Sequence, residues 1–310
     1  MQHYWSLENI QLHDVWLTIG SFDGVHIGHQ SIIREVVEGA KKDASSSVVL
    51  TFHPHPDTVL KKKDGAFYLT SPQEQAGILG ELGIDFVITY PFNKSVANTS
   101  TKDFIDRIYQ HLHFKCLCIG HDFALGKNRE GDLKALRTLG KEYGFHVRVI
   151  DPLFEDGKLV SSSRIRAALH DGDLRQVNRM LGRPYQINGK VVHGDGRGHT
   201  LGIPTANFEA WKEKALPKSG VYACIALVDG GKYPAVTNIG IRPTFDHSSL
   251  KPIIESHIIN FDQNIYDHNI SLLMIDYIRE EKRFDNVKAL ISQIEADINQ
   301  TKTIFAKEPG

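Results

Sequence analysis

The chain has 310 residues, of which 41% are hydrophobic and 24% are charged, as is ordinary for a soluble globular protein. Its formal net charge of −1 gives no sign of nucleic-acid binding, and no apolar run reaches the roughly 18 residues of a membrane span. Three cysteines make a poor disulfide framework and fit a reducing cytosol, so we expect a cytoplasmic protein. The length favours two domains over one.

The first half of the chain alternates predicted strands and helices. Residues 71–74 (SPQE) form a capping box with proline at the first helical position, so a helix should begin there and end near Gly83. The alternation predicts a parallel sheet with right-handed crossovers. The predicted strands cover residues 15–19, 45–52, 84–90, 114–120 and 145–150, and the other predicted helices cover 100–113, 132–143, 162–170 and 174–181.

The most informative segment follows the first predicted strand and reads GSFDGVHIGH over residues 20–29. Apolar residues at helical spacing come next, from Ile32 to Ala40. Two histidines, turn glycines and a helix start therefore meet at the carboxyl end of a strand. Open α/β sheets bind their ligands there, and helix N–H groups favour phosphate, so we expect a nucleotide at this point.

His26 and His29 lie three positions apart across the helix start, so both imidazoles can face one ligand. Gly28 would let a phosphate approach the backbone. Such a site suits nucleotidyl transfer, whose transition state spreads negative charge over phosphoryl oxygens. Two alternatives stay open. One is a structural turn with surface histidines, and the other is a metal-binding histidine pair to which His53 or His55 could contribute.

The last part of this half reads VSSSRIR over residues 160–166. Hydroxyl groups at a helix start can cap the helix or bind phosphate, and Arg166 can add a bidentate contact. An N-cap with a basic first turn is the simpler interpretation of this string by itself.

The pattern changes after Tyr185, and we place the boundary near residues 182–187. Asp229-Gly230-Gly231 has the composition of a tight hairpin turn. Several strands without intervening helices predict a small antiparallel barrel or sandwich. The predicted strands cover residues 221–228, 232–239, 253–261 and 270–279, and one helix covers 287–298.

A glycine-rich segment, GKVVHGDGRG over residues 189–198, lies near the start of this half. Glycines let backbone amides close around phosphates, although the Walker spacing is absent and a flexible hairpin is the simpler interpretation. Thr205 and Asn207 follow, and their neutral oxygens suit a Mg²⁺ ion bridging to phosphates. A turn cap is the alternative for this pair.

The strings HIGH at residues 26–29 and VSSSRIR at 160–166 resemble, in order and separation, the HxGH and SSTxIR motifs of the nucleotidyltransferase superfamily. FDGVH at 22–26 and TFHPHP at 51–56 resemble the adenylyltransferase half of bacterial bifunctional riboflavin kinase/FAD synthetases. This resemblance implies a Rossmann-like α/β nucleotidyltransferase domain over residues 1–184. It implies ATP binding by Gly20, Phe22, His26, Gly28, His29, Ser162, Ser163 and Arg166, with His29 catalytic, and a flavin pocket of Phe52, His55, Pro56 and Asp122.

The chain departs from that family at two places. Ser163 replaces the usual threonine and keeps the hydroxyl. Residues 120–126 read GHDFALG where the family has a segment like GxDFRFG, so Ala124 and Leu125 remove one cation and one aromatic surface. Lys127 and Arg129 are candidates to replace the charge. Adenylyl transfer is accordingly the activity at risk.

PTAN at residues 204–207 is the signature of riboflavin kinase, whose fold is a small antiparallel β-barrel with a terminal helix. The resemblance implies this domain over residues 185–310. It implies ATP binding by Gly189, Lys190, Gly196, Gly198, Thr205 and Asn207, Mg²⁺ binding by Thr205 and Asn207, and flavin binding by Tyr222, Glu255 and Arg279.

Glu255 matches the catalytic glutamate of the family. The chemistry requires such a group, because a hydroxyl must lose its proton as it attacks the γ-phosphate of ATP. An exposed strand carboxylate is the alternative for Glu255, and a surface ion pair is the alternative for Arg279.

The resemblance implies two reactions, phosphorylation of riboflavin to FMN with MgATP and adenylylation of FMN to FAD with release of pyrophosphate. Riboflavin, FMN, FAD and ATP are the expected partners, and neither nucleic acid nor a membrane is expected. Two alternatives are an enzyme that has lost one activity and a flavin-binding regulator without turnover. A cytidylyl or pantetheine-phosphate transferase would share HxGH and leave the second half unexplained. The sequence leaves the oligomeric state open.

Overall fold

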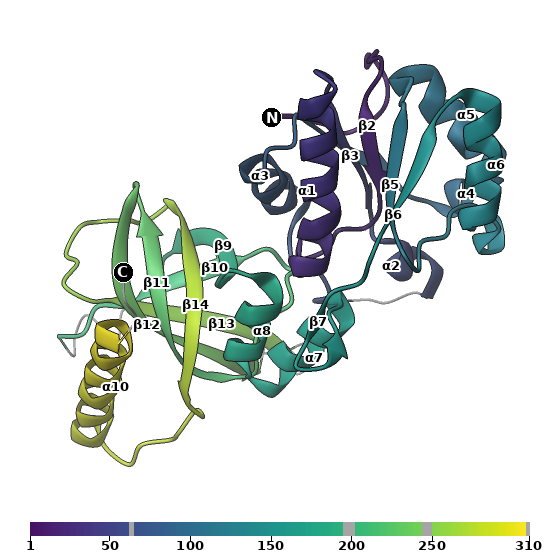
Figure 1. Ribbon diagram of the computed structural model, residues 1–310. Coiled ribbons are helices and arrows are strands. Elements are labelled where there is room, and N and C mark those ends of the chain that lie inside the picture. The colour runs from purple at the N-terminus through teal and green to yellow at the C-terminus, as the bar shows by residue number, and fades with distance from the viewer. Residues whose placement is uncertain (62–64, 195–201, 244–249, 308–310) are drawn as a thin grey trace. The chain divides into compact units, whose positions relative to one another are not determined.

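The computed structural model describes residues 1–61, 65–194, 202–243 and 250–307. The chain divides into two compact units, Met1–Ser162 and Ser163–Gly310 (Figure 1). The first unit contains a parallel six-stranded sheet and the second a closed antiparallel barrel with a terminal helix, which confirms the predicted fold class. The division between functional domains at residues 184/185 stays a prediction. By packing, the helices after Ser162 belong to the barrel unit.

The sheet of the first unit has the strand order β1-β4-β3-β2-β5-β6, and all its strand pairs are parallel. Its central strands are apolar on both faces, as expected for a sheet that helices cover on both sides. The five predicted strands are confirmed, and β1 was missed because three residues carry no periodic signal. The strands are β1 (Gln2–Tyr4), β2 (Trp16–Ile19), β3 (Ser47–His53), β4 (Phe86–Pro91), β5 (Cys116–Gly120) and β6 (His146–Ile150).

Helices cover both faces of this sheet (Figure 1). α1 (Ile27–Lys42) and α3 (Pro72–Glu81) pack on one face, and α5 (Thr101–Leu112) and α6 (Leu133–Tyr143) pack on the other. Since strand side chains alternate, odd and even positions of one strand enter different cores. The capping box predicted at Ser71 is present at the start of α3.

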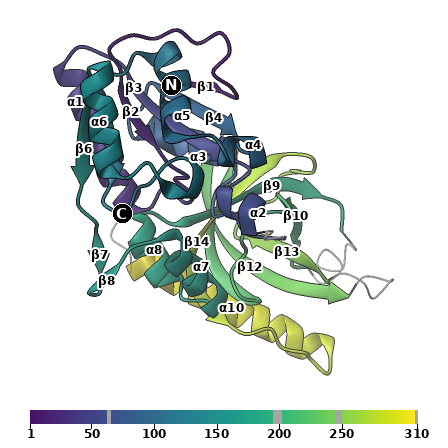
Figure 2. The same ribbon diagram turned by 90° about the vertical axis from the view of Figure 1, so that its right-hand side faces the viewer.

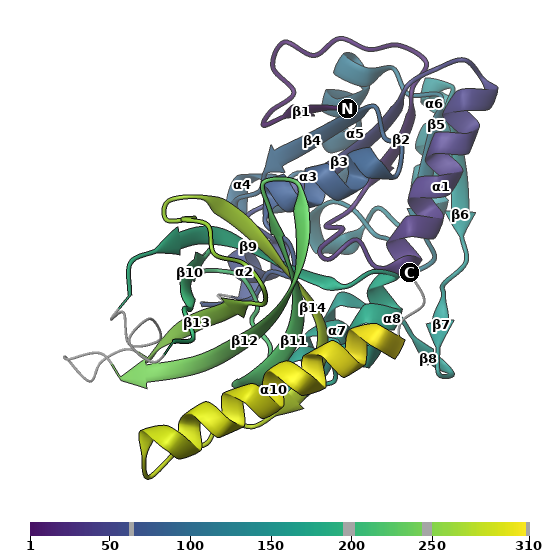
Figure 3. The ribbon, with the colours of Figure 1, turned by 90° about the vertical axis from the view of Figure 1, so that its left-hand side faces the viewer.

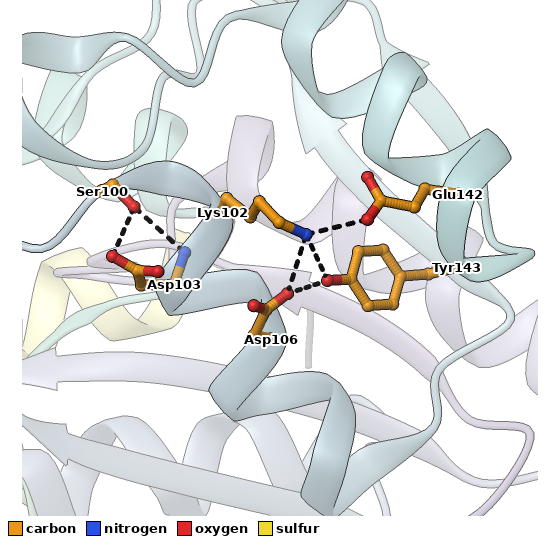
Figure 4. A network of polar contacts seen from close by, with 6 residues as sticks. All are labelled: Ser100, Lys102, Asp103, Asp106, Glu142 and Tyr143. Atoms are coloured by element: carbon orange, nitrogen blue, oxygen red, sulfur yellow. Dashed lines mark hydrogen bonds and ion pairs between the residues drawn. The ribbon is translucent and has the colours of Figure 1, made fainter.

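A polar network ties α5 to α6 on the surface of the sheet unit (Figure 4). Lys102 Nζ donates to Glu142 Oε1 and to the Tyr143 hydroxyl, both at 2.8 Å. The Tyr143 hydroxyl in turn donates to the Asp106 carboxylate. Ser100 caps α5 by accepting from the Asp103 N–H at 3.1 Å.

The barrel closes in the order β10-β13-β12-β11-β14-β9. Asp229 and Gly230 have φ of 47° and 83°, so the predicted hairpin turn has the left-handed pair of a type I′ turn. The strands are β9 (Tyr185–Val192), β10 (Ala206–Ala210), β11 (Gly220–Val228), β12 (Gly231–Pro243), β13 (Leu250–Ile258) and β14 (Asn269–Arg279).

Two of these strands, β9 and β10, were not predicted, because the glycine-rich string was interpreted as a loop. Gly189 lies inside β9 where a Cβ would be 2.3 Å from the carbonyl oxygen of Glu209 on β10. The glycine therefore allows two strands to approach closely and does not interrupt the sheet.

α10 (Val287–Lys307) lies across the barrel strands and is longer than the predicted helix (Figure 3). No helix in the described part of the chain is long and apolar enough to cross a membrane. The remaining elements are α2 (Pro56–Lys61), α4 (Lys94–Ala97), the 3₁₀ turn Lys127–Arg129, the hairpin of β7 (Phe154–Glu155) and β8 (Lys158–Leu159), α7 (Ser162–Asp171) and α8 (Leu174–Leu181).

Candidate functional site

In the first unit, the candidate site lies at the carboxyl ends of three neighbouring strands. β2 lies between β3 and β5. The chain continues from β2 to β3 on one side and later reaches β5 on the other. The gap between β2 and β5 is therefore the topological switch point, where doubly wound sheets open a crevice for ligands. The turn that begins at Gly20 and the segment that begins at Gly120 both start there.

The turn between β2 and α1 is strained. Phe22 and Val25 have φ of 45° and 41°, left-handed values that residues with a Cβ rarely adopt, and Gly24 between them has φ of 81°. Each such non-glycine residue costs about 1–3 kcal/mol and persists only where its surroundings enforce it. Backbone strain of this kind is concentrated at ligand sites.

Asp23, which was not among the predicted site residues, enforces this conformation. Its buried carboxylate accepts hydrogen bonds from the backbone N–H groups of Leu69 at 2.9 Å and Thr70 at 3.1 Å. The Thr70 hydroxyl accepts another from the Gly24 N–H at 3.1 Å. An acidic residue beside a turn glycine is the only local signal for this role, because its partners lie 46 and 47 positions away.

Two carbonyl groups of the turn also accept hydrogen bonds from side chains. The Ser21 carbonyl accepts from the Thr51 hydroxyl at 3.0 Å and from the Gln75 amide at 2.8 Å. The Asp23 carbonyl accepts from the Ser162 hydroxyl at 2.8 Å. Ser162 is thus brought to the turn that holds the two histidines, while its contact with ATP stays a prediction.

The rings of His26 and His29 stack with their centroids 3.6 Å apart. His26 caps α1 by accepting from the His29 N–H at Nδ1, 3.2 Å away, so its ring proton is on Nε2. His29 Nδ1 is buried and has no hydrogen-bond partner in the described ranges. Burial first, and His26 second, lower the pKa of His29 well below 6.5. His29 is therefore neutral at pH 7.

The alternative of a metal-binding histidine pair finds no third ligand among the residues that the structure describes. His55 Nδ1 accepts from the Asp57 N–H at 3.0 Å. Within the described ranges, no group of three His, Cys, Asp or Glu side chains could hold a metal ion.

The predicted flavin residues come from the strands that flank β2. Phe52 is the second-last residue of β3, and its ring lies 5.5 Å from that of Phe92. The ring of His55 lies 5.2 Å from that of Phe67. Pro56 begins α2. Asp122 follows β5 and is exposed. The topology therefore puts these residues at the same edge of the sheet, and their contact with flavin stays a prediction.

Arg129 lies beside residues 120–126, the segment in which Ala124 replaces the usual arginine of the family. Its guanidinium donates to the Asp122 carbonyl at 2.8 Å. Arg129, Asp122 and Ala124 also line one cavity of about 700 Å³ at the end of β5. A cation is thus present beside this segment, carried by a residue further along the chain.

Ser163 and Arg166 fall in the second unit, so their predicted contacts with ATP stay predictions. Both lie in the first two turns of α7, as the sequence analysis expected.

In the barrel, three polar residues form a row across neighbouring strands. Strand β13 lies between β10 and β12 (Figure 2). Glu255 on β13 is in register with Asn207 on β10 and with Asn238 on β12. Paired residues in antiparallel strands point to the same face, so the predicted base and the predicted metal ligand are direct neighbours. All three are half-buried. Asn238 was not among the predicted site residues, because only the strand register reveals its position beside Glu255.

The chain after β9 passes close to this row, and a cavity lies beside Thr205. A Cβ at Gly194 would lie 1.9 Å from Asn207 Nδ2, so the chain after β9 passes directly over this side chain. Thr205 lines a cavity of about 440 Å³ together with Ile258 and Tyr266. The predicted ATP residues Gly196 and Gly198 lie outside the described residues.

Other predicted kinase residues have partners within the barrel unit. Lys190 Nζ is 2.7 Å from Asp267 Oδ1. Tyr222 is fully buried, its hydroxyl donates to the Lys218 carbonyl, and burial raises its pKa. The guanidinium of Arg279 forms an ion pair with Asp297. An ion pair was the alternative considered for Arg279, but its partner carboxylate is buried and not on the surface. Direct ligand contacts of these residues, and of Gly189, stay predictions.

Comparisons with known proteins agree with this two-part organisation. Residues 8–164 match the FAD synthetase family, and residues 181–305 match the riboflavin kinase family. The chain is similar to bifunctional riboflavin kinase/FMN adenylyltransferases from Bacillus subtilis, at 36% identity over 94% of the chain and 92% of the relative, and from Escherichia coli, at 36% over 93% and 92%. The relative from Listeria monocytogenes is 34% identical over 94% of this chain and 92% of its own.

The fold also matches a crystal structure described as that of a macrolide-efflux protein from Streptococcus pneumoniae. The TM-score is 0.87 and the sequence identity 28%, and the match covers 97% of this chain and 98% of the other. The whole two-unit architecture is therefore shared with a solved structure.

Proposed function

Since the chain belongs to the bifunctional riboflavin kinase/FMN adenylyltransferase family, we propose how its residues divide the two reactions. The barrel transfers the γ-phosphoryl group of ATP to riboflavin and forms FMN. The sheet unit joins the AMP part of a second ATP to FMN, forms FAD and releases pyrophosphate. We assign residues 1–184 to the adenylyltransferase and 185–310 to the kinase.

The register of Glu255 with Asn207 is the observation that supports the kinase assignment. In this proposal Glu255 accepts the proton that the riboflavin hydroxyl loses as it attacks the γ-phosphate. The cavity that Thr205 lines would receive part of ATP. A base beside a phosphate-binding residue is what this transfer requires, and a binding protein without turnover has no use for it.

Mg²⁺ fits the residues at the start of β10. The ion prefers hard oxygen ligands and usually keeps several waters while it binds substrate phosphates. Thr205 and Asn207 supply a hydroxyl and an amide oxygen at alternate positions, which share one face of an extended chain. We propose that these two residues hold Mg²⁺, which would neutralise charge on the phosphates of ATP.

At the sheet unit, adenylyl transfer needs no strong base, because the attacking phosphate of FMN is already an anion. Alignment and charge stabilisation carry the rate. We assign the neutral His29, the capped start of α1 and Gly28 to the phosphates of ATP, with Ser162, Ser163 and Arg166. The residues Phe52, His55, Pro56 and Asp122 are assigned to the flavin, and Arg129 supplies a cation near them.

We also place the protein in the cytoplasm, since its three cysteines are free and buried thiols, typical of a reducing compartment. A net charge of −1 supports the absence of a nucleic-acid partner.

The test is incubation of the purified chain with riboflavin, Mg²⁺ and ATP, followed by chromatographic separation of the flavins. FMN should appear first and FAD second, and FMN supplied with ATP should give FAD and pyrophosphate directly. Failure of the second incubation would contradict the adenylyltransferase assignment, and failure to phosphorylate riboflavin would contradict the kinase assignment.

A further inference from the structure

Two cysteines of β5 form a close pair inside the sheet unit. Cys116 and Cys118 point to the same face of the strand, toward α1, and their sulfur atoms are 4.0 Å apart. Both are buried, with 3% and 0% of their surface exposed. We propose that this pair is a two-coordinate binding site for a soft monovalent cation such as Cu(I) or Ag(I). The proposal is independent of the flavin chemistry.

The sulfur separation suits a bridging ion. If the metal–sulfur distance is about the 2.3 Å of zinc thiolates, two sulfurs 4.0 Å apart subtend an angle of about 120° at a cation between them. Small side-chain rotations that widen the gap by about 0.6 Å would make the arrangement linear. Thiolate sulfur is the ligand that selects soft cations.

The ligand count argues against zinc. A structural zinc ion takes four ligands in a tetrahedron. In the described part of the chain, no group of three His, Cys, Asp or Glu side chains converges, and this pair is therefore limited to two strong ligands. A site with two ligands binds well only those cations that accept a low coordination number.

The surroundings of the pair supply charge and an unused polar atom. Thr18 on β2 is in register with Cys118, and its hydroxyl is buried without a hydrogen-bond partner in the described ranges. Arg148 on β6 is in register with Cys118 from the other side. The cation replaces both thiol protons, and Arg148, which is paired with Glu35, lies beside the resulting complex.

An entry route exists on the same side of the sheet. Cys116 lines a cavity of about 610 Å³ together with Trp16, Glu35, His146 and Arg148. This cavity lies at the amino end of β5, whereas Gly120 at the carboxyl end begins the segment near the predicted flavin site. Cation binding and nucleotide binding are therefore separate.

The test uses the reduced full chain and Ag(I), with an excess of free methionine to remove weakly held silver. Native mass spectrometry should find about one Ag(I) per chain. Cys116→Ser and Cys118→Ser should each lose it, whereas Cys224→Ser, which removes the lone buried thiol of the barrel, should keep it. Silver that stays in either single variant, or that is lost from Cys224→Ser, would overturn the proposal.

A second probe avoids substitutions altogether. Phenylarsine oxide bridges two neighbouring thiols, forming two As–S bonds and releasing its oxygen with both thiol protons as water. The wild-type chain should gain one such adduct, and prior loading with Ag(I) should block it. An adduct that forms equally fast on the silver-loaded chain would show that the cation is bound elsewhere.

Discussion

Arg279 and Asp297 form a two-pronged ion pair that fastens α10 to β14. Arg279 Nε donates to Asp297 Oδ1 at 2.9 Å, and Nη2 donates to Oδ2 at 2.7 Å. Gln293 also donates to Asp297 Oδ1 at 2.9 Å. The carboxylate is 2% exposed, so it depends on these partners for its charge to be tolerated inside the protein.

Arg279→Ala should therefore destabilise the barrel by about 3–5 kcal/mol, because it leaves a buried carboxylate without its cation. Denaturant unfolding of the full chain measures the effect. Arg175→Ala is the matched control, since Arg175 pairs with Asp276 at an exposed position and its loss should change little. Equal stability of the two variants would contradict an anchoring role for Arg279.

Glu255→Gln should lower the rate of FMN formation about 10²–10⁴-fold, because the hydroxyl of riboflavin loses its proton acceptor. Formation of FAD from supplied FMN should be unchanged. Glu209→Gln provides the control, as Glu209 is an exposed carboxylate on the neighbouring strand β10. Unchanged kinase turnover in the Glu255 variant would remove this residue from its role.

His29→Ala should abolish FAD formation and spare FMN formation, since it removes the ring nitrogen assigned to the phosphates of ATP. The two rates are measured separately, with riboflavin or FMN as the flavin supplied. Equal loss of both activities would contradict separate sites.

The low pKa of His29 predicts how the stability of the sheet unit depends on pH. The folded state disfavours the charged ring, whereas the unfolded chain binds a proton below about pH 6.5. The contribution of His29 to the free energy of unfolding should be constant above that pH. It should fall as the pH drops from there toward the pKa of His29 in the folded state. His29→Gln should reduce this decline, and an identical pH profile in both proteins would exclude His29 as its source.

Gly194→Ala should impair FMN formation, because the new methyl group would occupy the position of the Asn207 side chain. Displacing Asn207 moves a proposed Mg²⁺ ligand, so a higher Mg²⁺ requirement of the kinase reaction is expected. The concentration of Mg²⁺ that gives half-maximal rate is the measurement, with FAD formation from FMN as the internal control. A kinase that needs no additional Mg²⁺ would show that Asn207 can move without consequence.

The strands and helices that could be predicted are those with strong local signals. The capping box at Ser71 specifies where α3 begins, and the turn residues Asp229 and Gly230 specify a hairpin, because their conformational preferences act over a few residues. The candidate site at residues 20–29 was recognisable for the same reason. Its histidines, glycines and helix start are contiguous in the chain.

Other features depend on residues that only folding brings together. β9 and β10 were missed because Gly189 is a strand residue only when β10 lies against it. Asn238 lies beside Glu255 only because their strands pair in that register. Asp23 holds the strained turn through hydrogen bonds to Leu69 and Thr70, which are distant in the sequence. The amino-acid sequence by itself determined the two-part organisation and the chemistry of the turn. Strand pairing and burial, which depend on contacts between distant residues, decided the strand order of the barrel, the partner of Arg279 and the pairing of Glu255 with Asn207.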